Sequence, residues 1–260
     1  MAIERIVPGT KEWDAYYANH IVRYKFAAAQ IKGNGQKILD AACGVGYGSH
    51  FISTKGIGKI TAIDRSEEAL AIAVKNFSNT DILFLKDDCH TLSGAQKYGP
   101  FHSIISFETL EHLPKPADFL NACYKNLEQN GTIIISTPNI YVSSPDGIVN
   151  WEYHEKEYTP DEFQYLLQQS GFSGIRLFGQ QLNKMGKLKE EFRAELNRLN
   201  SNPFIRLGKI IQKVLKGHKD KAILPESESD FDIVEYTGNI TAIKELGIDG
   251  PFVLIAVATK

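Results

Sequence analysis

The fold is decided by one stretch of sequence, Ile38-Leu39-Asp40-Ala41-Ala42-Cys43-Gly44-Val45-Gly46-Tyr47-Gly48. A short apolar run ends there in a glycine turn, where the missing Cβ lets the backbone approach a ligand closely. Asp64 lies 20 residues beyond Gly44, at the end of the next predicted strand. A carboxylate at that position can accept hydrogen bonds from both hydroxyls of a ribose. The alternative is a tight strand-to-helix turn with a capping aspartate and no ligand.

Outward from this stretch, strand-like and helix-like segments alternate between residues 37 and 178. Strands are predicted at residues 37–42, 59–63, 82–85, 101–107, 132–136, 175–178 and 252–259. Helices are predicted from Ser66 onward, over residues 116–127, and from Thr159, which is followed by a proline at the first helical position. Such alternation predicts an α/β fold with a mainly parallel sheet of seven strands and helices on both faces.

The pattern also divides the chain into three parts. These are an N-terminal helical segment at 1–36, a core at 37–179 and 251–260, and a helical insertion at 180–250. The N-terminal segment carries an aromatic-rich helix around residues 13–29. In the insertion, leucine and phenylalanine recur at helical spacing over residues 188–199, and a second helix is predicted over residues 202–217.

Composition and charge are those of an ordinary globular protein, with 43% hydrophobic residues, 23% charged residues and a formal net charge of −2. The three cysteines show no paired spacing, which is typical of reduced thiols. The longest apolar run, at residues 252–258, has seven residues, whereas a bilayer span needs ~20. Residues 1–10 contain no apolar signal-peptide core. We therefore expect a cytoplasmic protein.

With these motifs in order, the chain resembles the class I S-adenosylmethionine-dependent methyltransferases. The resemblance covers about residues 37–178 and the last strand, and it implies a Rossmann-like fold with S-adenosylmethionine as cofactor. Residues 38–48 match the first motif of the family, residues 64–66 its ribose-binding segment, and residues 85–89 its adenine-contacting segment. The cofactor-binding residues that the resemblance implies are Asp40, Ala42, Gly44, Gly46, Asp64, Arg65, Asp88, Cys89 and Phe107.

Two positions depart from the family pattern. Ala42 stands where many members have glycine, and His102 stands where aspartate is usual. An NAD-dependent oxidoreductase on a similar sheet is the alternative enzyme class. The chain contains no Tyr-x-x-x-Lys pattern that would supply a hydride-transfer acid, so the methyltransferase is favoured.

The second informative cluster is Glu108-Thr109-Leu110-Glu111-His112, which follows the fourth predicted strand and has the form E-x-x-E-H. If this segment makes one helical turn, its acidic side chains and its histidine converge at the carboxyl edge of the sheet. A second histidine, His154, follows the fifth predicted strand. Two carboxylates and two imidazoles can hold one divalent cation and leave positions open for substrate oxygens.

The E-x-x-E-H stretch and the later histidine resemble those of the small-RNA terminal 2′-O-methyltransferases, and ubiquinone-type O-methyltransferases show a similar stretch. The resemblance implies Mg²⁺ or Mn²⁺ with four ligands, namely Glu108, Glu111, His112 and His154. Metal-free relatives keep a Glu-His pair at this place. In that case Glu111 and His112 are catalytic, with His112 as the general base, or the pair is purely structural.

The N-terminal helix gives the evidence on the class of methyl acceptor. His20, Arg23 and Tyr24 are spaced so that they share one helix face. The surrounding segment is similar to the start of methyltransferases associated with bacterial surface polysaccharide and sugar modification, and this resemblance implies a lid whose three residues face the substrate cleft. It favours a hydroxyl acceptor on a sugar, a glycan or a small molecule. The alternative is a packed helix with an incidental polar edge.

The insertion is charged asymmetrically. Residues 184–221 hold eleven Lys/Arg and four Asp/Glu, whereas residues 222–250 hold one Lys and seven Asp/Glu. A basic amphipathic helix can bind a membrane surface, a phosphate-bearing substrate or RNA, or it can be a solvated face neutralised by the acidic stretch. RNA 2′-O-methylation, N-methylation of a small molecule and a non-catalytic binding role are therefore alternative functions, and a homodimer is left open.

Overall fold

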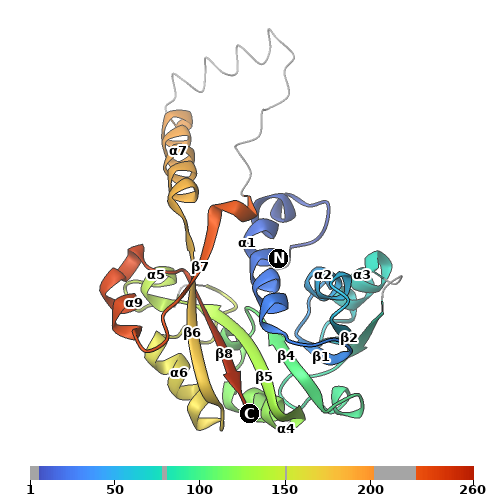
Figure 1. Ribbon diagram of the computed structural model, residues 1–260. Coiled ribbons are helices and arrows are strands. Elements are labelled where there is room, and N and C mark those ends of the chain that lie inside the picture. The colour runs from blue at the N-terminus through green and yellow to red at the C-terminus, as the bar shows by residue number, and fades with distance from the viewer. Residues whose placement is uncertain (1–5, 78–80, 150, 202–226) are drawn as a thin grey trace.

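The short apolar runs of the sequence form strands that pair in one sheet, as a computed structural model shows (Figure 1). The structure describes residues 6–77, 81–149, 151–201 and 227–260. Within these ranges the strands are β1 (Gln36–Ala41), β2 (Gly58–Asp64), β3 (Ile82–Lys86), β4 (Phe101–Ser106), β5 (Leu127–Pro138), β6 (Ser173–Leu182), β7 (Phe231–Glu235) and β8 (Val253–Thr259). The helices are α1 (Lys11–Gln30), α2 (Tyr47–Thr54), α3 (Glu67–Phe77), α4 (Pro116–Asn126), α5 (Ile140–Ser143), α6 (Pro160–Gln169), α7 (Lys184–Ser201) and α9 (Ile240–Leu246).

The strand order is β3-β2-β1-β4-β5-β8-β6-β7. Strands β1 to β5 pair in parallel, whereas β8 runs antiparallel to both β5 and β6, and β7 runs antiparallel to β6. The mainly parallel α/β sheet is therefore confirmed, and each of the seven predicted strands is present. Strand β7 is an eighth strand that the sequence analysis does not predict. Its sequence is Phe231-Asp232-Ile233-Val234-Glu235, in which an acidic residue interrupts the apolar ones, so its apolar signal is short.

Helices cover both faces of the sheet, as predicted. On one face, α4, α6 and α9 place Phe119, Phe163 and Ile243 against the sheet, and these side chains are fully buried. On the other face, α1, α2 and α3 contribute Ile21, Ile52 and Leu70. Adjacent residues of the central strands enter opposite clusters, which is why those strands are continuous apolar runs.

The predicted helix starts have the expected chemistry. Thr159 caps α6, with its side chain accepting from the N–H of Glu162 while the Glu162 carboxylate accepts from the N–H of Thr159. Pro160 follows at the first helical position. Helix α1 is capped by Thr10, whose side chain accepts from the N–H of Trp13. Helix α1 then runs along one face of the sheet and ends near the start of β1 (Figure 1).

The segment predicted as an insertion contains a helix that projects away from the sheet and a strand that belongs to it. Helix α7 confirms the first predicted helix of the segment and projects from the end of β6 (Figure 1). Lys189 of α7 donates two hydrogen bonds to the buried Asp230, at 2.7 and 2.9 Å. Strand β7 then pairs with β6, and α9 packs on the core. The second predicted helix, at 202–217, lies outside the described residues.

Among the helices that the structure describes, none has both the length and the apolar character needed to cross a bilayer.

Candidate active site

The glycine turn after β1 has the backbone conformation that glycine favours. Gly44 has φ +56° and Gly46 has φ +81°. A Cβ built on Gly44 would meet no atom within 4 Å, so this position borders open space. A Cβ on Gly46 would lie 2.8 Å from the Cβ of Ala73 and 2.8 Å from a ring carbon of Phe84. Gly44 therefore leaves room for a ligand, whereas Gly46 is also required by the packing of α3 and β3.

Ala42 shares this left-handed conformation, with φ +66°. The sequence comparison with the family suggests only an added methyl group at this position. The structure adds a second effect, because an alanine in the left-handed region is strained by about 1–2 kcal/mol.

Asp64, the expected ribose ligand, lies at the end of β2 and is 8% exposed. Its Oδ2 accepts a hydrogen bond from the N–H of Gly44 at 2.9 Å, and its Oδ1 accepts from the N–H of Ser66 at 2.8 Å. The carboxylate therefore fastens the glycine turn to the start of α3. A carboxylate has about four acceptor positions, so it can still accept from ribose hydroxyls.

Asp40 is buried at the end of β1. Ser49 donates to its Oδ2 at 2.5 Å, and the Tyr24 hydroxyl lies 3.4 Å from its Oδ1. Burial raises the pKa of Asp40 to about 7, while the hydrogen bonds from Ser49 and Tyr24 oppose that rise. The Tyr24 ring occupies the space above Gly48, where a Cβ would lie 1.9 Å from a ring carbon. The third glycine of the turn therefore makes room for the lid helix.

Each of the three predicted lid residues of α1 contacts a residue outside the helix. His20 lies 3.2 Å from the Tyr47 hydroxyl through its Nδ1, and Tyr24 packs edge-on against Phe107 at 5.0 Å. Arg23 is 1% exposed, and its Nη1 donates to Asn19 and Gln180 at 3.0 and 2.8 Å.

Arg23 is a buried cation whose hydrogen-bonding capacity is incompletely used. Its Nε has no hydrogen-bond partner, and among the described residues no carboxylate lies within ion-pair distance of the guanidinium. Burial, followed by the charge of Arg23, holds the pKa of His20 well below its usual value. A buried charge without a counter-ion is costly, so the surroundings of Arg23 suit an anionic group.

The expected adenine segment follows β3. Asp88 is exposed, and its Oδ1 accepts from the N–H and from the Nδ1 of His90, both at 2.9 Å. These hydrogen bonds lower the pKa of Asp88. Cys89 is half-buried, and burial raises the pKa of its thiol to about 11, so the thiol is uncharged at neutral pH. Arg65 is exposed on the neighbouring strand end.

The E-x-x-E-H stretch forms a single 3₁₀ turn, η2 (Leu110–His112), at the carboxyl end of β4. Glu111 is 1% exposed and accepts from the Thr137 hydroxyl at 3.1 Å. Burial and then the charge of Glu108 raise the pKa of Glu111 well above its usual value. Glu108 itself adopts φ +50°, and its carboxylate accepts from the Ser136 hydroxyl at 2.7 Å.

Three of the four expected metal ligands come together. One ligand atom from each of Glu111, His112 and His154 lies within 4.8 Å of the other two, and the two imidazole rings are 4.9 Å apart. Glu108 does not belong to this group. The expectation that it converges assumes a helical turn through the whole stretch, but the turn begins only after Glu108, whose left-handed backbone directs it to Ser136.

Both histidine rings are fixed by acceptors at Nδ1. His112 Nδ1 lies 2.8 Å from the Tyr153 carbonyl oxygen, and His154 Nδ1 lies 2.8 Å from a carboxylate oxygen of Glu157. A carbonyl or carboxylate oxygen can only accept, so each Nδ1 carries the proton. In a neutral ring the lone pair of His154 then lies on Nε2, and the Nε2 of His112 lies 3.7 Å from a carboxylate oxygen of Glu111.

The sequence analysis overlooks two neighbours of this cluster. Glu157 is 1% exposed and lies behind His154. Trp151 is 62% exposed and stacks on the His154 ring at 5.9 Å. No signal in a single sequence separates Glu157 from the nearby exposed Glu155.

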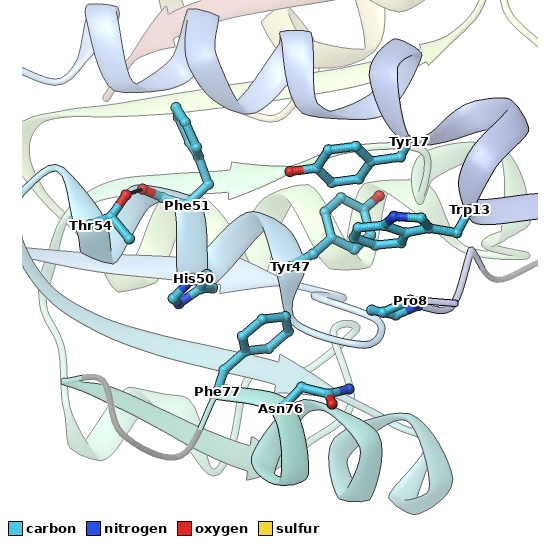
Figure 2. Close-up of a pocket in the computed structure, with 9 residues that line it drawn as sticks. All are labelled: Pro8, Trp13, Tyr17, Tyr47, His50, Phe51, Thr54, Asn76 and Phe77. Atoms are coloured by element: carbon cyan, nitrogen blue, oxygen red, sulfur yellow. Dashed lines mark hydrogen bonds between the residues drawn. The ribbon is translucent and has the colours of Figure 1, made fainter. Parts of the chain in front are cut away.

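A cavity of about 490 Å³ lies on the other side of the glycine turn, between α1, α2 and α3. Figure 2 shows Trp13 and Tyr17 of α1 beside Tyr47 of α2, and His50 facing Phe77. Trp13 stacks on Tyr17 at 4.1 Å and meets Tyr47 edge-on at 5.6 Å. These ring contacts hold the N-terminal half of the lid helix against α2.

Comparison with known proteins gives consistent similarities. Residues 12–177 match a family model described as a methyltransferase domain. A probable S-adenosylmethionine-dependent methyltransferase of Mycolicibacterium smegmatis is 29% identical over 171 residues, which cover 65% of this chain and 63% of that protein. A ubiquinone biosynthesis O-methyltransferase of Xanthomonas campestris is 30% identical over 135 residues, which cover 49% of this chain and 56% of that protein. The chain thus spans less than two thirds of the length of either relative.

Solved structures agree on the fold. A structure of a SAM-dependent methyltransferase from Archaeoglobus fulgidus superposes with a TM-score of 0.58 at 16% identity, covering 94% of each chain. At such low identity this likeness concerns the arrangement of strands and helices alone.

Proposed function

The chain belongs to the methyltransferase domain family and uses S-adenosylmethionine, and from this premise we propose that it methylates a hydroxyl oxygen on a sugar, a glycan or a small molecule. The observation that carries the proposal is the group formed by Glu111, His112 and His154. The group lies at the edge of the sheet where open α/β folds bind their ligands. The O-methyltransferase named among the relatives supports a hydroxyl as the acceptor.

We assign the cofactor to the open space beside Gly44, at the carboxyl ends of β1 and β2. S-adenosylmethionine supplies a methyl group that is already activated on a sulfonium, so the protein has mainly to align the reacting atoms. Gly44 leaves open space for the cofactor, and Asp64 retains acceptor capacity for its ribose hydroxyls. Arg23, buried without a carboxylate partner, suits the carboxylate of the methionine part.

The donor set at η2 fits a divalent cation. One carboxylate and two imidazole nitrogens would hold it and would leave about three of six positions open. A cation bound there lowers the pKa of an acceptor hydroxyl and fixes its oxygen. Because Mg²⁺ prefers an all-oxygen shell, two nitrogen ligands favour Mn²⁺ of the two expected cations. In a metal-free reaction the Nε2 of His112, which lies beside the Glu111 carboxylate, would instead take the acceptor proton.

The test combines metal binding with turnover. Manganese binding is measured by electron paramagnetic resonance for the wild type, for His154→Ala, and for His102→Ala, a histidine on β4 outside the cluster. Turnover is measured with labelled S-adenosylmethionine on a panel of a catechol, a methyl glycoside and a short RNA, with and without chelator. We expect His154→Ala and the chelator to abolish both metal binding and turnover, and His102→Ala to leave both unchanged.

The outcomes separate the alternatives. Full turnover in excess chelator, with His154→Ala near the wild type, excludes the metal and leaves His112 as the base, whose loss should then lower the rate by about 10²–10⁴-fold. Methylation of the RNA 2′-hydroxyl alone would replace the sugar or small-molecule acceptor by RNA. Methylation of an amine in place of any hydroxyl would contradict the proposal.

Three other expectations stay predictions. A cytoplasmic location is supported by the three cysteines, which are all free. A homodimer is tested by the mass of the protein in solution. The division into a lid, a core and an insertion is tested by limited proteolysis, which should cut first within residues 180–250.

A further inference from the structure

We propose that Glu157 is a positioning residue that holds the His154 imidazole with its Nε2 lone pair directed to the cluster of Glu111 and His112. The inference rests on the proposed function only in naming what that lone pair binds. The geometry behind it is independent of the metal. It consists of a fully buried carboxylate, two short hydrogen bonds, and a loop fixed to the end of β5.

The Glu157 side chain is enclosed, with 0% of its surface exposed, and each of its oxygens has one partner. Oε1 accepts from His154 Nδ1 at 2.8 Å, and Oε2 accepts from the Ser143 hydroxyl at 2.5 Å. Since the carboxylate can only accept, the ring proton of His154 is confined to Nδ1. The lone pair of His154 must then lie on Nε2, on the side of the ring away from Glu157.

The backbone that carries Glu157 is itself held in place. Tyr158 pairs with Asn139 in an isolated parallel bridge, and its carbonyl accepts from the N–H of Ile140 at 3.2 Å. Asn139 directly follows β5 and is fully buried. Ser143, the other partner of Glu157, lies on α5, which begins just after Asn139. The relay from Ser143 through Glu157 to His154 is therefore anchored on the sheet.

The charge of Glu157 is the second observation. Among the described residues, the only ion-pairing group within 4.0 Å of this carboxylate is the imidazole of His154. Burying a carboxylate with neutral donors alone is unfavourable by several kcal/mol. A cation bound to His154 would offset that cost. In metal sites, a carboxylate that accepts from the other ring nitrogen of a ligating histidine also raises the basicity of that histidine. His112 differs, because its Nδ1 meets a neutral carbonyl oxygen.

The first experiment uses the wild-type protein without metal. A long-range ¹⁵N–¹H correlation spectrum, with the His154 signals assigned from His154→Gln, reports which ring nitrogen carries the proton. We expect the single proton of the neutral ring to lie on Nδ1. A neutral ring with its proton on Nε2, or a mixture of the two neutral tautomers, would overturn the proposal whether or not the protein binds a metal.

The second experiment compares Glu157→Gln with Glu155→Gln, a matched change at an exposed glutamate two residues away. Manganese affinity is measured by electron paramagnetic resonance. We expect Glu157→Gln to weaken binding by roughly 10–100-fold and to shift the His154 ring signals, while Glu155→Gln matches the wild type. Wild-type affinity and wild-type ring signals in Glu157→Gln would show that the carboxylate only fills space.

Two further outcomes are informative. If Glu157→Gln fails to fold by circular dichroism, Ser143→Ala takes its place. It frees one oxygen of Glu157, and we expect a smaller loss of manganese affinity, whereas an unchanged affinity counts against the relay. If the wild type binds no manganese but Glu157→Gln still moves the ring proton, the metal is excluded and the positioning of His154 stands.

Discussion

At the residue scale, Gly44 and Gly46 form a matched pair that separates ligand contact from packing. Both have positive φ, so an alanine at either position brings a similar backbone strain of about 1–2 kcal/mol. Only Gly46 adds a clash, because its new Cβ would lie 2.8 Å from Ala73 and from Phe84. We expect Gly46→Ala to lose roughly 1–3 kcal/mol more stability than Gly44→Ala in urea unfolding.

For cofactor affinity we expect Gly44→Ala to have the more direct effect of the two. Gly44→Ala places a methyl group in the open space beside the turn, so S-adenosylhomocysteine binding, measured by calorimetry on folded protein, should weaken although the fold survives. Equal stability of the two variants would show that the crowding around Gly46 relaxes without cost. Unchanged affinity in Gly44→Ala would show that the cofactor does not approach this residue.

At this scale the sequence predicts the glycine turn and the place of Asp64 at the end of β2, because both follow from spacing along the chain. The separation of Glu108 from Glu111 is not found, because a left-handed residue at the end of β4 cannot be deduced from a glutamate. Glu157 escapes for a similar reason, since its role depends on burial, which a polar residue in a polar loop does not reveal.

At the element scale, helix α7 is attached to the body largely by Asp230. This buried carboxylate accepts two hydrogen bonds from Lys189 and one from the N–H of Ser227 at 2.8 Å. Gly186 lies so close that a Cβ there would be 2.4 Å from the Asp230 carbonyl oxygen. We expect Asp230→Ala to cost about 1–3 kcal/mol locally, seen as faster amide hydrogen exchange in α7 with β1 and β4 unchanged.

The control for this prediction is Glu228→Ala. Glu228 forms an exposed ion pair with Lys25, and exposed pairs contribute about 0–1 kcal/mol. Exchange in α7 should therefore stay near the wild type. An α7 that exchanges equally in both variants would mean that the helix is held by other contacts.

Element prediction is uneven for physical reasons. Helix α6 is marked by Thr159, Pro160 and Glu162, whose capping chemistry is local in sequence. Strand β7 has no such local marker, because its pairing with β6 is a long-range contact and an acidic residue interrupts its apolar ones. The strands that pair with β8 cannot be predicted from the sequence either, because a continuous apolar run indicates a buried strand but not its partners in the sheet.

At the scale of the whole molecule, Asp40 makes stability depend on pH. Burial raises its pKa from 3.8 to about 7, so the folded state keeps a proton that the unfolded chain has already released. The stabilisation from this group is therefore fully present below its unfolded pKa and is lost as the pH rises through about 7. Asp40→Asn stays neutral and removes this loss.

We expect the difference in unfolding free energy between Asp40→Asn and the wild type to shift in favour of the variant as the pH rises from about 5 to about 8. Urea unfolding without cofactor at several pH values measures it. Asp118→Asn, at an exposed residue in the first turn of α4, is the control. A difference that stays constant with pH would show that Asp40 is ionised throughout this range.

The position of β8 has a consequence for how the protein is made. This strand separates β5 from β6, and Thr132 pairs with Thr259, about half the chain length away. While a ribosome is still synthesising residues before 253, the nascent chain can assemble β3-β2-β1-β4-β5 but leaves the edges of β5 and β6 unpaired. Open edges of this kind invite association between neighbouring chains, so the pairing of β8 with β5 and β6 also ends the period in which aggregation competes with folding.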